Sequence, residues 1–210
     1  MIKYITQLAI IFLFTGSVNA QFEGRIKFDI SYQWKLDDGL TTEQFTQYMG
    51  DKMEYFSKGA YYKSNINGMI YTTQIYSPKE NRLYNVINEN DTLVWINAAI
   101  NTDTVLNYSI EDSDEVILGY KCQVFVIETT RGTGKYYFSK EIGVDPELYK
   151  NHNYGNFALV TSRTKSLSLK IEIDNESFNM LFEAVEVKDM NIDDSFFKIP
   201  DLPSKETPNY

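Results

Sequence analysis

Hydrophobic and polar residues alternate along much of the chain with a period of two, which predicts β-strands that have one buried face. The clearest case is residues 22–34, whose apolar side chains all share one parity: Phe22, Ile26, Phe28, Ile30, Tyr32 and Trp34. Residues 166–173 alternate in the same way, with Leu167, Leu169, Ile171 and Ile173 on one side. Strands of this kind are typical of an antiparallel sheet with one face in water.

Similar runs, separated by turns rich in Gly, Asn, Asp, Ser and Pro, predict further strands along the chain. We expect them at residues 52–56, 60–66, 69–76, 82–87, 92–97, 116–129, 134–140, 157–163 and 178–188.

Two short helices are predicted between these strands. Residues 41–44, Thr-Thr-Glu-Gln, have the pattern of a capping box, so a helix is expected over residues 42–49, with Gly50 ending it. Asp145 followed by Pro146 is a typical helix start, which predicts a second short helix over residues 145–150.

About ten strands and two short helices predict a mainly β fold, in which a curved antiparallel sheet or half-barrel is covered by one or two short helices. An open sheet with one apolar face has to close or to be covered. No linker rich in Pro, Gly or Ser divides the chain, so one β-rich domain is expected over residues 21–202. Residues 203–210, which include Pro203 and Pro208, are expected to form a flexible C-terminal tail.

The first 20 residues have the pattern of a secretory signal peptide. Lys3 precedes a short apolar run, and Val18-Asn19-Ala20 is typical of a cleavage site, so we expect cleavage after Ala20. The apolar run is shorter than the roughly 20 residues of a spanning helix. The sequence therefore predicts a periplasmic or secreted protein that does not span the membrane.

The negative net charge of the chain bears on which macromolecules it can bind. The chain has 20 basic and 29 acidic residues and a formal net charge of −9. Nucleic acids require a basic surface, so they are not expected as partners.

The side chains that most often carry chemistry are scarce. Cys122 is the single cysteine and shares the parity of Tyr120 and Val124, which predicts a buried and inert thiol. His152 is the single histidine, lies in the polar segment 151–155, and is expected at the surface or as a pin for this loop. Residues 132–134, Gly-Thr-Gly, are expected to form a hairpin turn and not a nucleotide loop.

No metal-ligand spacing, cofactor motif or catalytic motif is recognised. The sequence therefore predicts a protein that is not an enzyme and that uses no cofactor or metal.

The apolar faces of the predicted strands are rich in aromatic residues, since Tyr and Phe account for 29 of the 210 residues. Such a face can line a ligand cavity, or it can form a fully packed core. Both interpretations remain open from the sequence. The candidate cavity residues are Phe28, Ile30, Tyr32, Trp34, Tyr71, Tyr84, Trp95, Tyr120, Val124 and Leu169.

Several short motifs carry a family resemblance that covers most of residues 22–202. Residues 117–122 (Ile-Leu-Gly-Tyr-Lys-Cys), 135–142 and 145–147 resemble a group of small bacterial secreted proteins of unknown function, related to the GLPGLI family. The namesake motif of that family is absent, and residues 153–157 stand at about its place. Residues 184–188 and 196–200 are similar to the last strand of this group and of the LolA-like superfamily of outer-membrane lipoprotein carriers.

This resemblance implies a half-barrel wrapped over one or two helices, with an apolar concavity that holds acyl chains in the carrier proteins. The two predicted helices would serve as its lid or plug. The main hypothesis is therefore a non-enzymatic protein that binds an apolar ligand, such as a lipid or the acyl chains of a lipoprotein, in the concave face of the sheet. The alternative is an envelope module with a fully packed core and no ligand, which binds another protein through a sheet edge or its acidic surface.

Overall fold

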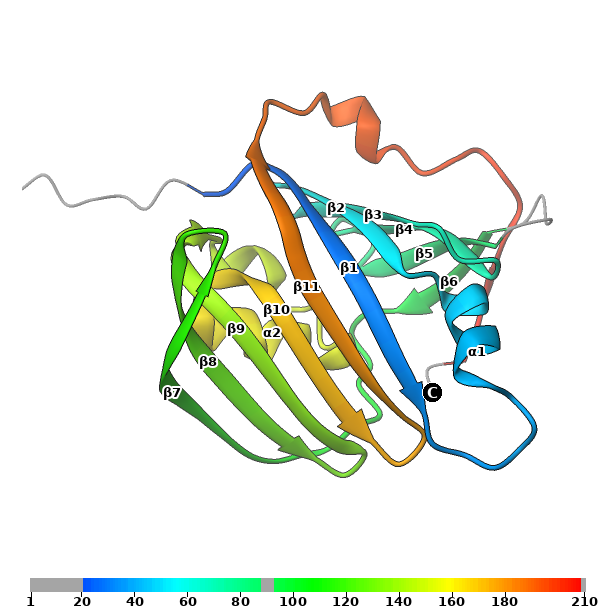
Figure 1. Cartoon of the computed structure of the whole chain (residues 1–210). Helices are drawn as coiled ribbons and strands as arrows, with labels where there is room; N and C mark the ends of the chain where they lie inside the picture. The colour runs from blue at the N-terminus through cyan, green and yellow to red at the C-terminus, as the bar shows by residue number, and fades with distance from the viewer. Residues whose placement is uncertain (1–20, 88–92, 209–210) are drawn as a thin grey trace, which may run out of the picture.

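The computed structural model describes residues 21–87 and 93–208, which form one open and strongly curved sheet (Figure 1). The predicted signal peptide, residues 1–20, lies outside this part. Within the described residues the sheet has twelve strands, in the order β12-β6-β5-β4-β3-β2-β1-β11-β10-β9-β8-β7. Neighbouring strands are antiparallel, except that β12 runs parallel to β6.

The strands are β1 (Gly24–Trp34), β2 (Lys52–Lys58), β3 (Tyr61–Ile66), β4 (Tyr71–Ser77), β5 (Arg82–Ile87), β6 (Leu93–Asn97), β7 (Val105–Ile117), β8 (Tyr120–Thr129), β9 (Gly132–Gly143), β10 (Ser166–Asn175), β11 (Phe178–Asp189) and β12 (Ser204–Glu206). The helices are α1 (Thr42–Met49) and α2 (Phe157–Thr164), with three short 3-10 helices, η1 (Pro146–Tyr149), η2 (Tyr154–Asn156) and η3 (Asp194–Phe197). The predicted fold class, a mainly β curved sheet with short covering helices, is confirmed.

Strand β1 lies in the middle of the sheet, between β2 and β11, and shows the predicted alternation. Ile26, Phe28 and Ile30 are buried on the concave face. Arg25 faces the other way and forms ion pairs with Glu54 of β2 and Glu186 of β11. The concave face is therefore apolar, and the convex face carries charges.

Helix α1 begins and ends as predicted. The Thr41 hydroxyl accepts a hydrogen bond from the Gln44 amide, and the Gln44 side chain accepts one from the Thr41 amide, which completes the capping box. Gly50 follows with a φ of 88°, a conformation that favours glycine. A Cβ there would lie 2.5 Å from the amide nitrogen of Gly68, so the end of α1 sits directly on the turn between β3 and β4.

Helix α2 lies inside the curve of the sheet, where Figure 1 shows it behind β9 and β10. Its Val160 packs with Phe125, Ile127 and Phe138 from β8 and β9. The sequence predicted a strand over residues 157–163, and this prediction is wrong. The predicted helix over residues 145–150 is present as the short 3-10 helix η1, with the Asp145 carboxylate accepting a hydrogen bond from the Glu147 amide.

The chain after β11 crosses the outside of the sheet and returns to β6 (Figure 1). Phe197 of η3 and Ile192 pack with Phe56 on the convex face of β2. Strand β12 then pairs in parallel with β6 (Leu93–Asn97), with Ser204 opposite Leu93. The predicted flexible tail over residues 203–210 therefore contains an ordered strand, which covers one edge of the sheet.

Strand β7 is longer than predicted, because only its last two residues fell within the strand expected at residues 116–129. The missed part of β7 contains four acidic residues, Glu111, Asp112, Asp114 and Glu115, a composition that is typical of solvent-exposed segments. Among the described residues, no helix is long and apolar enough to cross a lipid bilayer.

Candidate functional site on the concave face

The concave face changes from buried to half-exposed along the length of its central strands. At one end Ile26, Phe28, Leu169 and Ala184 are buried. Toward the turn between β10 and β11, the side chains of the same face become half-exposed. We call this second region the open half, formed by Tyr32, Trp34, Ile171, Ile173, Phe178, Met180 and Phe182.

Strand register brings these side chains together. Trp34 pairs with Phe178, Tyr32 with Met180, and Ile30 with Phe182. On the other side of β11, Ile173 pairs with Met180 and Ile171 with Phe182. Because paired residues point to the same face of a sheet, the open half is one continuous apolar surface across β1, β11 and β10.

Helix α1 adds an aromatic corner to the open half. The ring of Phe45 stacks on Trp34, with 4.5 Å between centroids, and meets Tyr32 edge-on at 5.2 Å. Phe45 also lies 5.6 Å from Phe178. The Trp34 indole N–H donates a hydrogen bond of 3.0 Å to Asp38, which fixes the orientation of the indole ring.

The aromatic corner contains one hydroxyl group, that of Tyr32, whose pKa is raised by its surroundings. Burial, and then the charge of Asp51, raise the pKa of Tyr32 to about 12. The Tyr32 hydroxyl, which is neutral at pH 7 even at its ordinary pKa, therefore stays neutral to a still higher pH.

The other half of the concave face is filled by aromatic rings under α2 and η1. The buried side chains of Tyr62, Tyr76, Tyr149 and His152 pack there beside Phe157. The His152 ring lies 4.4 Å from the Tyr76 ring and 4.7 Å from the Phe157 ring. We call this region the covered half, and it is a packed core.

His152 is 1 % exposed, so the prediction of a surface position is wrong. Its Nε2 lies 2.7 Å from the Tyr62 hydroxyl, and its backbone carbonyl accepts a hydrogen bond from the Ala158 amide. The histidine does pin its loop, but from inside the core. Burial lowers its pKa to about 4, which makes the ring neutral at pH 7.

The ten candidate cavity residues do not lie together. Tyr32 and Trp34 line the open half, Ile30 lies at its inner limit, and Phe28 and Leu169 are buried in the covered half. Tyr71 belongs to β4, but its side chain lies outside the described part of the structure.

Tyr84, Trp95 and Val124 are on the convex face. Tyr84 pairs with Trp95, and both alternate with the core residues Leu83 and Ile96. The Arg82 guanidinium covers the Trp95 ring at 3.8 Å. Val124 pairs with Tyr137 and alternates with Phe125, which faces α2.

Tyr120 and Cys122 lie at the end of β8 that is far from the open half. Tyr120 pairs with Ile117 next to the turn between β7 and β8, and its ring packs against the core. Cys122 is 1 % exposed, which confirms the predicted burial, and this burial raises the pKa of its thiol.

Phe45, Phe178, Met180 and Phe182 are site residues that the sequence reasoning missed. The alternation of Phe178, Met180 and Phe182 within the predicted strand 178–188 was the available signal. Their position beside Trp34 depends on strand pairing, which alternation alone does not reveal.

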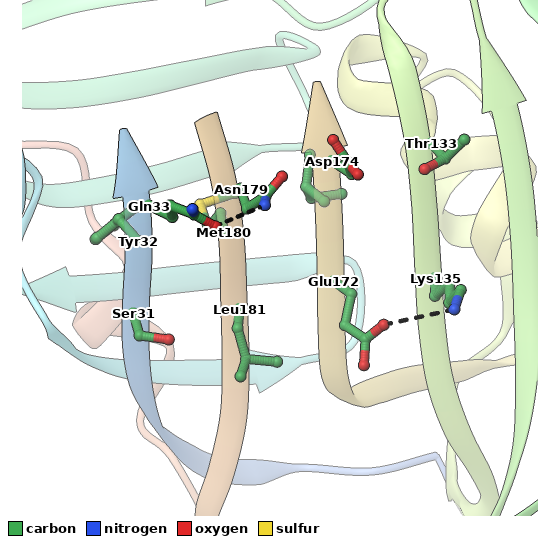
Figure 2. A pocket seen from close by; sticks show the side chains of 11 residues that line it. Ser31, Tyr32, Gln33, Thr133, Lys135, Glu172, Asp174, Asn179, Met180 and Leu181 are labelled. Carbon is green, nitrogen blue, oxygen red and sulfur yellow. Dashed lines mark hydrogen bonds and ion pairs between the residues drawn. The ribbon is translucent and has the colours of Figure 1, made fainter. Parts of the chain in front are cut away.

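A groove of about 460 Å³ lies over the same strands (Figure 2), and three residues of the open half, Tyr32, Ile173 and Met180, contribute to its lining. Ser31 and Gln33, which alternate with Tyr32 and Trp34, contribute to its lining. Lys135 faces Glu172 across it at 3.8 Å, and the Asn179 side-chain amide donates to Gln33 at 3.0 Å. The lining of this groove is mixed, with charged and amide side chains beside Ile173, Met180 and Leu181. Within the described residues, no group of three or more His, Cys, Asp or Glu side chains is placed to hold a metal ion.

Comparison with known proteins shows a likeness of fold. No protein-family model and no curated protein sequence matches the chain. Two crystal structures of PNGF-II, in space groups P21 and C2, are similar to it, each with a TM-score of 0.50 and with 13 % and 14 % sequence identity. They cover 89 % and 88 % of this chain but only 32 % and 31 % of the PNGF-II chain, so this chain spans about a third of that protein.

A LolA superfamily protein, NE2245 from Nitrosomonas europaea, is also similar. The match has a TM-score of 0.42 and 10 % identity, and covers 86 % of this chain and 91 % of that one. LolA is the superfamily that the closing sequence pattern resembles, but this match is too distant to support a functional argument. The resemblance to the GLPGLI family stays a prediction.

Proposed function

We propose that this chain is a non-enzymatic periplasmic or secreted protein that binds an apolar chain, such as a lipid tail or the acyl chain of a lipoprotein, in the open half of its concave face. The observation that carries the proposal is the continuous, half-exposed apolar surface formed across β1, β11 and β10. Burial of apolar surface contributes about 25 cal/mol per Å², or roughly 0.8 kcal/mol for each methylene group. An acyl chain lying on this surface would gain that free energy.

The covered half limits how far such a ligand reaches. From Trp34 to Ile30 the open half extends about 13 Å along β1, at roughly 3.3 Å per residue. Beyond Ile30 the rings of Tyr62, Tyr149 and His152 occupy the concavity. The ligand therefore lies near the turn between β10 and β11, and the alternative of a fully packed core describes only the covered half.

The position of His152 supports a function without catalysis. General acid–base catalysis requires a group within hydrogen-bond reach of the substrate. His152 is buried, neutral at pH 7 and hydrogen-bonded to Tyr62, so it is sealed from any ligand in the open half.

The two tryptophans provide an internal test. Trp34 lies in the open half, whereas Trp95 lies on the convex face under Arg82. In the Trp95→Phe variant, titration of delipidated protein with a brominated fatty acid should quench the fluorescence of Trp34 in a saturable way. In the matched Trp34→Phe variant, the remaining Trp95 should keep its fluorescence.

Two neighbouring substitutions on β11 sharpen this test. Met180 belongs to the open half, whereas Leu181 alternates with it on β11; both are half-exposed and both contribute to the lining of the groove. Met180→Arg should reduce the affinity for the fatty acid by at least about tenfold, because it places a charge on the apolar surface. Leu181→Arg should leave the affinity unchanged. Quenching that does not saturate, or an equal loss in both variants, would contradict the proposal.

A further inference from the structure

Strand β7 forms an open edge of the sheet. It is 13 residues long and pairs only with β8 in the described part of the chain. The opposite edge of the sheet is much shorter, because it is formed by the three-residue strand β12, which pairs with β6. An edge strand leaves backbone N–H and C=O groups unpaired, and these groups can pair with an added strand.

One face of β7 continues the apolar concave surface to the edge. Tyr108 and Ile110 pair with Ile127 and Phe125 of β8 and are 40 % and 45 % exposed. The Tyr108 ring stacks on Phe125 at 5.8 Å. Residues 107–112 keep an uninterrupted antiparallel register with β8, with bulges on either side, so they offer a regular template for one more strand.

The same stretch carries two carboxylates, those of Glu111 and Asp112, and the Arg163 guanidinium lies over the Tyr108 ring at 5.0 Å. The Glu111 carboxylate accepts a hydrogen bond from Ser109, and the Asp112 carboxylate accepts one from Gln123. Neither forms an ion pair with a Lys or Arg side chain among the described residues, in contrast to Glu115, which pairs with Lys170 at 3.1 Å. Glu111 lies on the face opposite to Tyr108 and Ile110, so a partner with basic side chains at alternate positions would place them beside Glu111.

We propose that residues 107–112 of β7 bind an extended segment of another protein, in which apolar and basic residues alternate, as an additional strand of the sheet. Its apolar side chains would lie beside Tyr108 and Ile110 on the concave face. Its basic side chains would lie near Glu111. This inference is independent of ligand binding in the open half.

A second copy of this chain is a poorer partner for the same edge. Residues 107–112 contain two carboxylates and no basic side chain, so antiparallel pairing of two β7 strands would gather four carboxylates at one edge and supply no basic partner for Glu111. Like charges on facing strands are destabilising. The acidic edge therefore selects a basic segment and opposes pairing with itself.

The first test uses a synthetic peptide of eight residues that alternates Val and Lys, added to the mature protein. We expect saturable binding in a calorimetric titration and slower amide hydrogen exchange confined to β7. A peptide that alternates Val and Glu should not bind. Dimerisation of the protein that protects the same amides would overturn the choice of partner.

The second test separates strand pairing from simple charge attraction. Two further peptides carry N-methyl groups on every Val or on every Lys, which blocks one or the other edge of the peptide strand. Only one of these peptides should lose binding, because residues at alternate positions direct their N–H groups to opposite edges. Unchanged binding of both peptides would overturn strand addition.

The third test reverses the charges of the edge. Glu111→Lys combined with Asp112→Lys should weaken binding of the Val–Lys peptide by about tenfold or more. The control combines Asp37→Lys with Asp201→Lys, two exposed carboxylates in loops, and has the same net charge. Equal weakening in both double variants would overturn the proposed position.

Met180→Arg should leave peptide binding unchanged, so the result does not depend on ligand binding in the open half.

Discussion

Protonation of the buried His152 imidazole would place a charge within the aromatic core. Its ring lies between the rings of Tyr76 and Phe157, and its Nε2 is hydrogen-bonded to the Tyr62 hydroxyl. Burial lowers the pKa of the folded protein's His152 from 6.5 to about 4. The unfolded chain therefore takes up a proton at a higher pH than the folded chain does.

This difference in pKa predicts a pH dependence of stability. Its contribution is complete above about pH 6.5 and is lost as the pH falls toward about 4, because only the unfolded state is protonated in that window. The free energy of unfolding should fall by up to about 1.4 kcal/mol per pH unit there. Urea unfolding at a series of pH values would measure this slope.

The His152→Gln variant is the control for this prediction. Glutamine retains hydrogen-bonding atoms for Tyr62 but does not titrate, so the variant should show a smaller slope between pH 6.5 and 4. Identical slopes in the two proteins would show that other groups cause the pH dependence.

Among the elements, the segment between β11 and β12, residues 190–203, packs on the convex face of the sheet. Phe197 of η3 is 5 % exposed and packs with Phe56 and Ile192. Phe197→Ala should lower the free energy of unfolding by about 3–5 kcal/mol, the usual cost of removing a buried phenylalanine ring. Leu202 lies on the same segment and is 36 % exposed, so Leu202→Ala should cost less than about 1 kcal/mol.

Chemical denaturation of the two variants would measure this difference. Equal and small losses would mean that the segment does not stabilise the sheet. Phe197→Ala should also expose Phe56, which lies beneath the segment. Increased binding of a hydrophobic dye to this variant would report that exposure independently.

Elements with strong local signals could be predicted from the sequence, whereas those determined by tertiary packing could not. β1 follows from its alternation and α1 from its capping box. α2 has the aromatic and β-branched residues of a strand. Its helix is stabilised by packing of Val160 against β8 and β9, and its Thr161 and Thr164 hydroxyls donate to carbonyls one turn earlier. For β7, the charges concealed an edge strand, whose outer side needs no apolar residues.

The candidate site was predictable only in part for a related reason. Tyr32 and Trp34 followed from alternation within one strand. Phe178 and Met180 belong to the site because β11 pairs with β1, although the two strands are far apart in the chain. Tyr84 and Trp95 are aromatic like cavity residues, but both lie on the convex face, where the Arg82 guanidinium covers the Trp95 ring and the Tyr84 hydroxyl donates a hydrogen bond to Glu80.

At the scale of the whole molecule, the two halves of the concave face differ in their packing. The covered half joins the sheet to α2 and η1 through packed rings, which supports the curvature. The open half is left apolar and accessible beside α1. Under the proposed function, the sheet presents the open half already formed, so ligand binding would require no large rearrangement of the fold.

Under the proposed function, the negative charge of the chain should disfavour apolar ligands that carry an anionic head group. The chain carries a formal charge of −9, and Asp38 lies next to Trp34 at the rim of the open half. Hydrogen bonds donated by the Trp34 indole and the Leu40 amide lower the pKa of Asp38, so its carboxylate is charged at pH 7. An acyl ligand with an anionic head group should be repelled there.

A fatty acid and a neutral monoacylglycerol of the same chain length should therefore respond differently to salt. Raising the ionic strength from about 0.01 M to about 0.1 M shortens the screening length from roughly 30 Å to 10 Å, which weakens the repulsion. The fatty acid should bind several-fold more tightly at the higher salt, whereas the monoacylglycerol should bind equally well at both.

Asp38→Asn, which keeps an oxygen acceptor for the Trp34 indole, should reduce the salt dependence of fatty-acid affinity. The control variant Asp201→Asn should leave this salt dependence unchanged. Weaker binding of the fatty acid at higher salt would instead indicate that a basic group holds the head group.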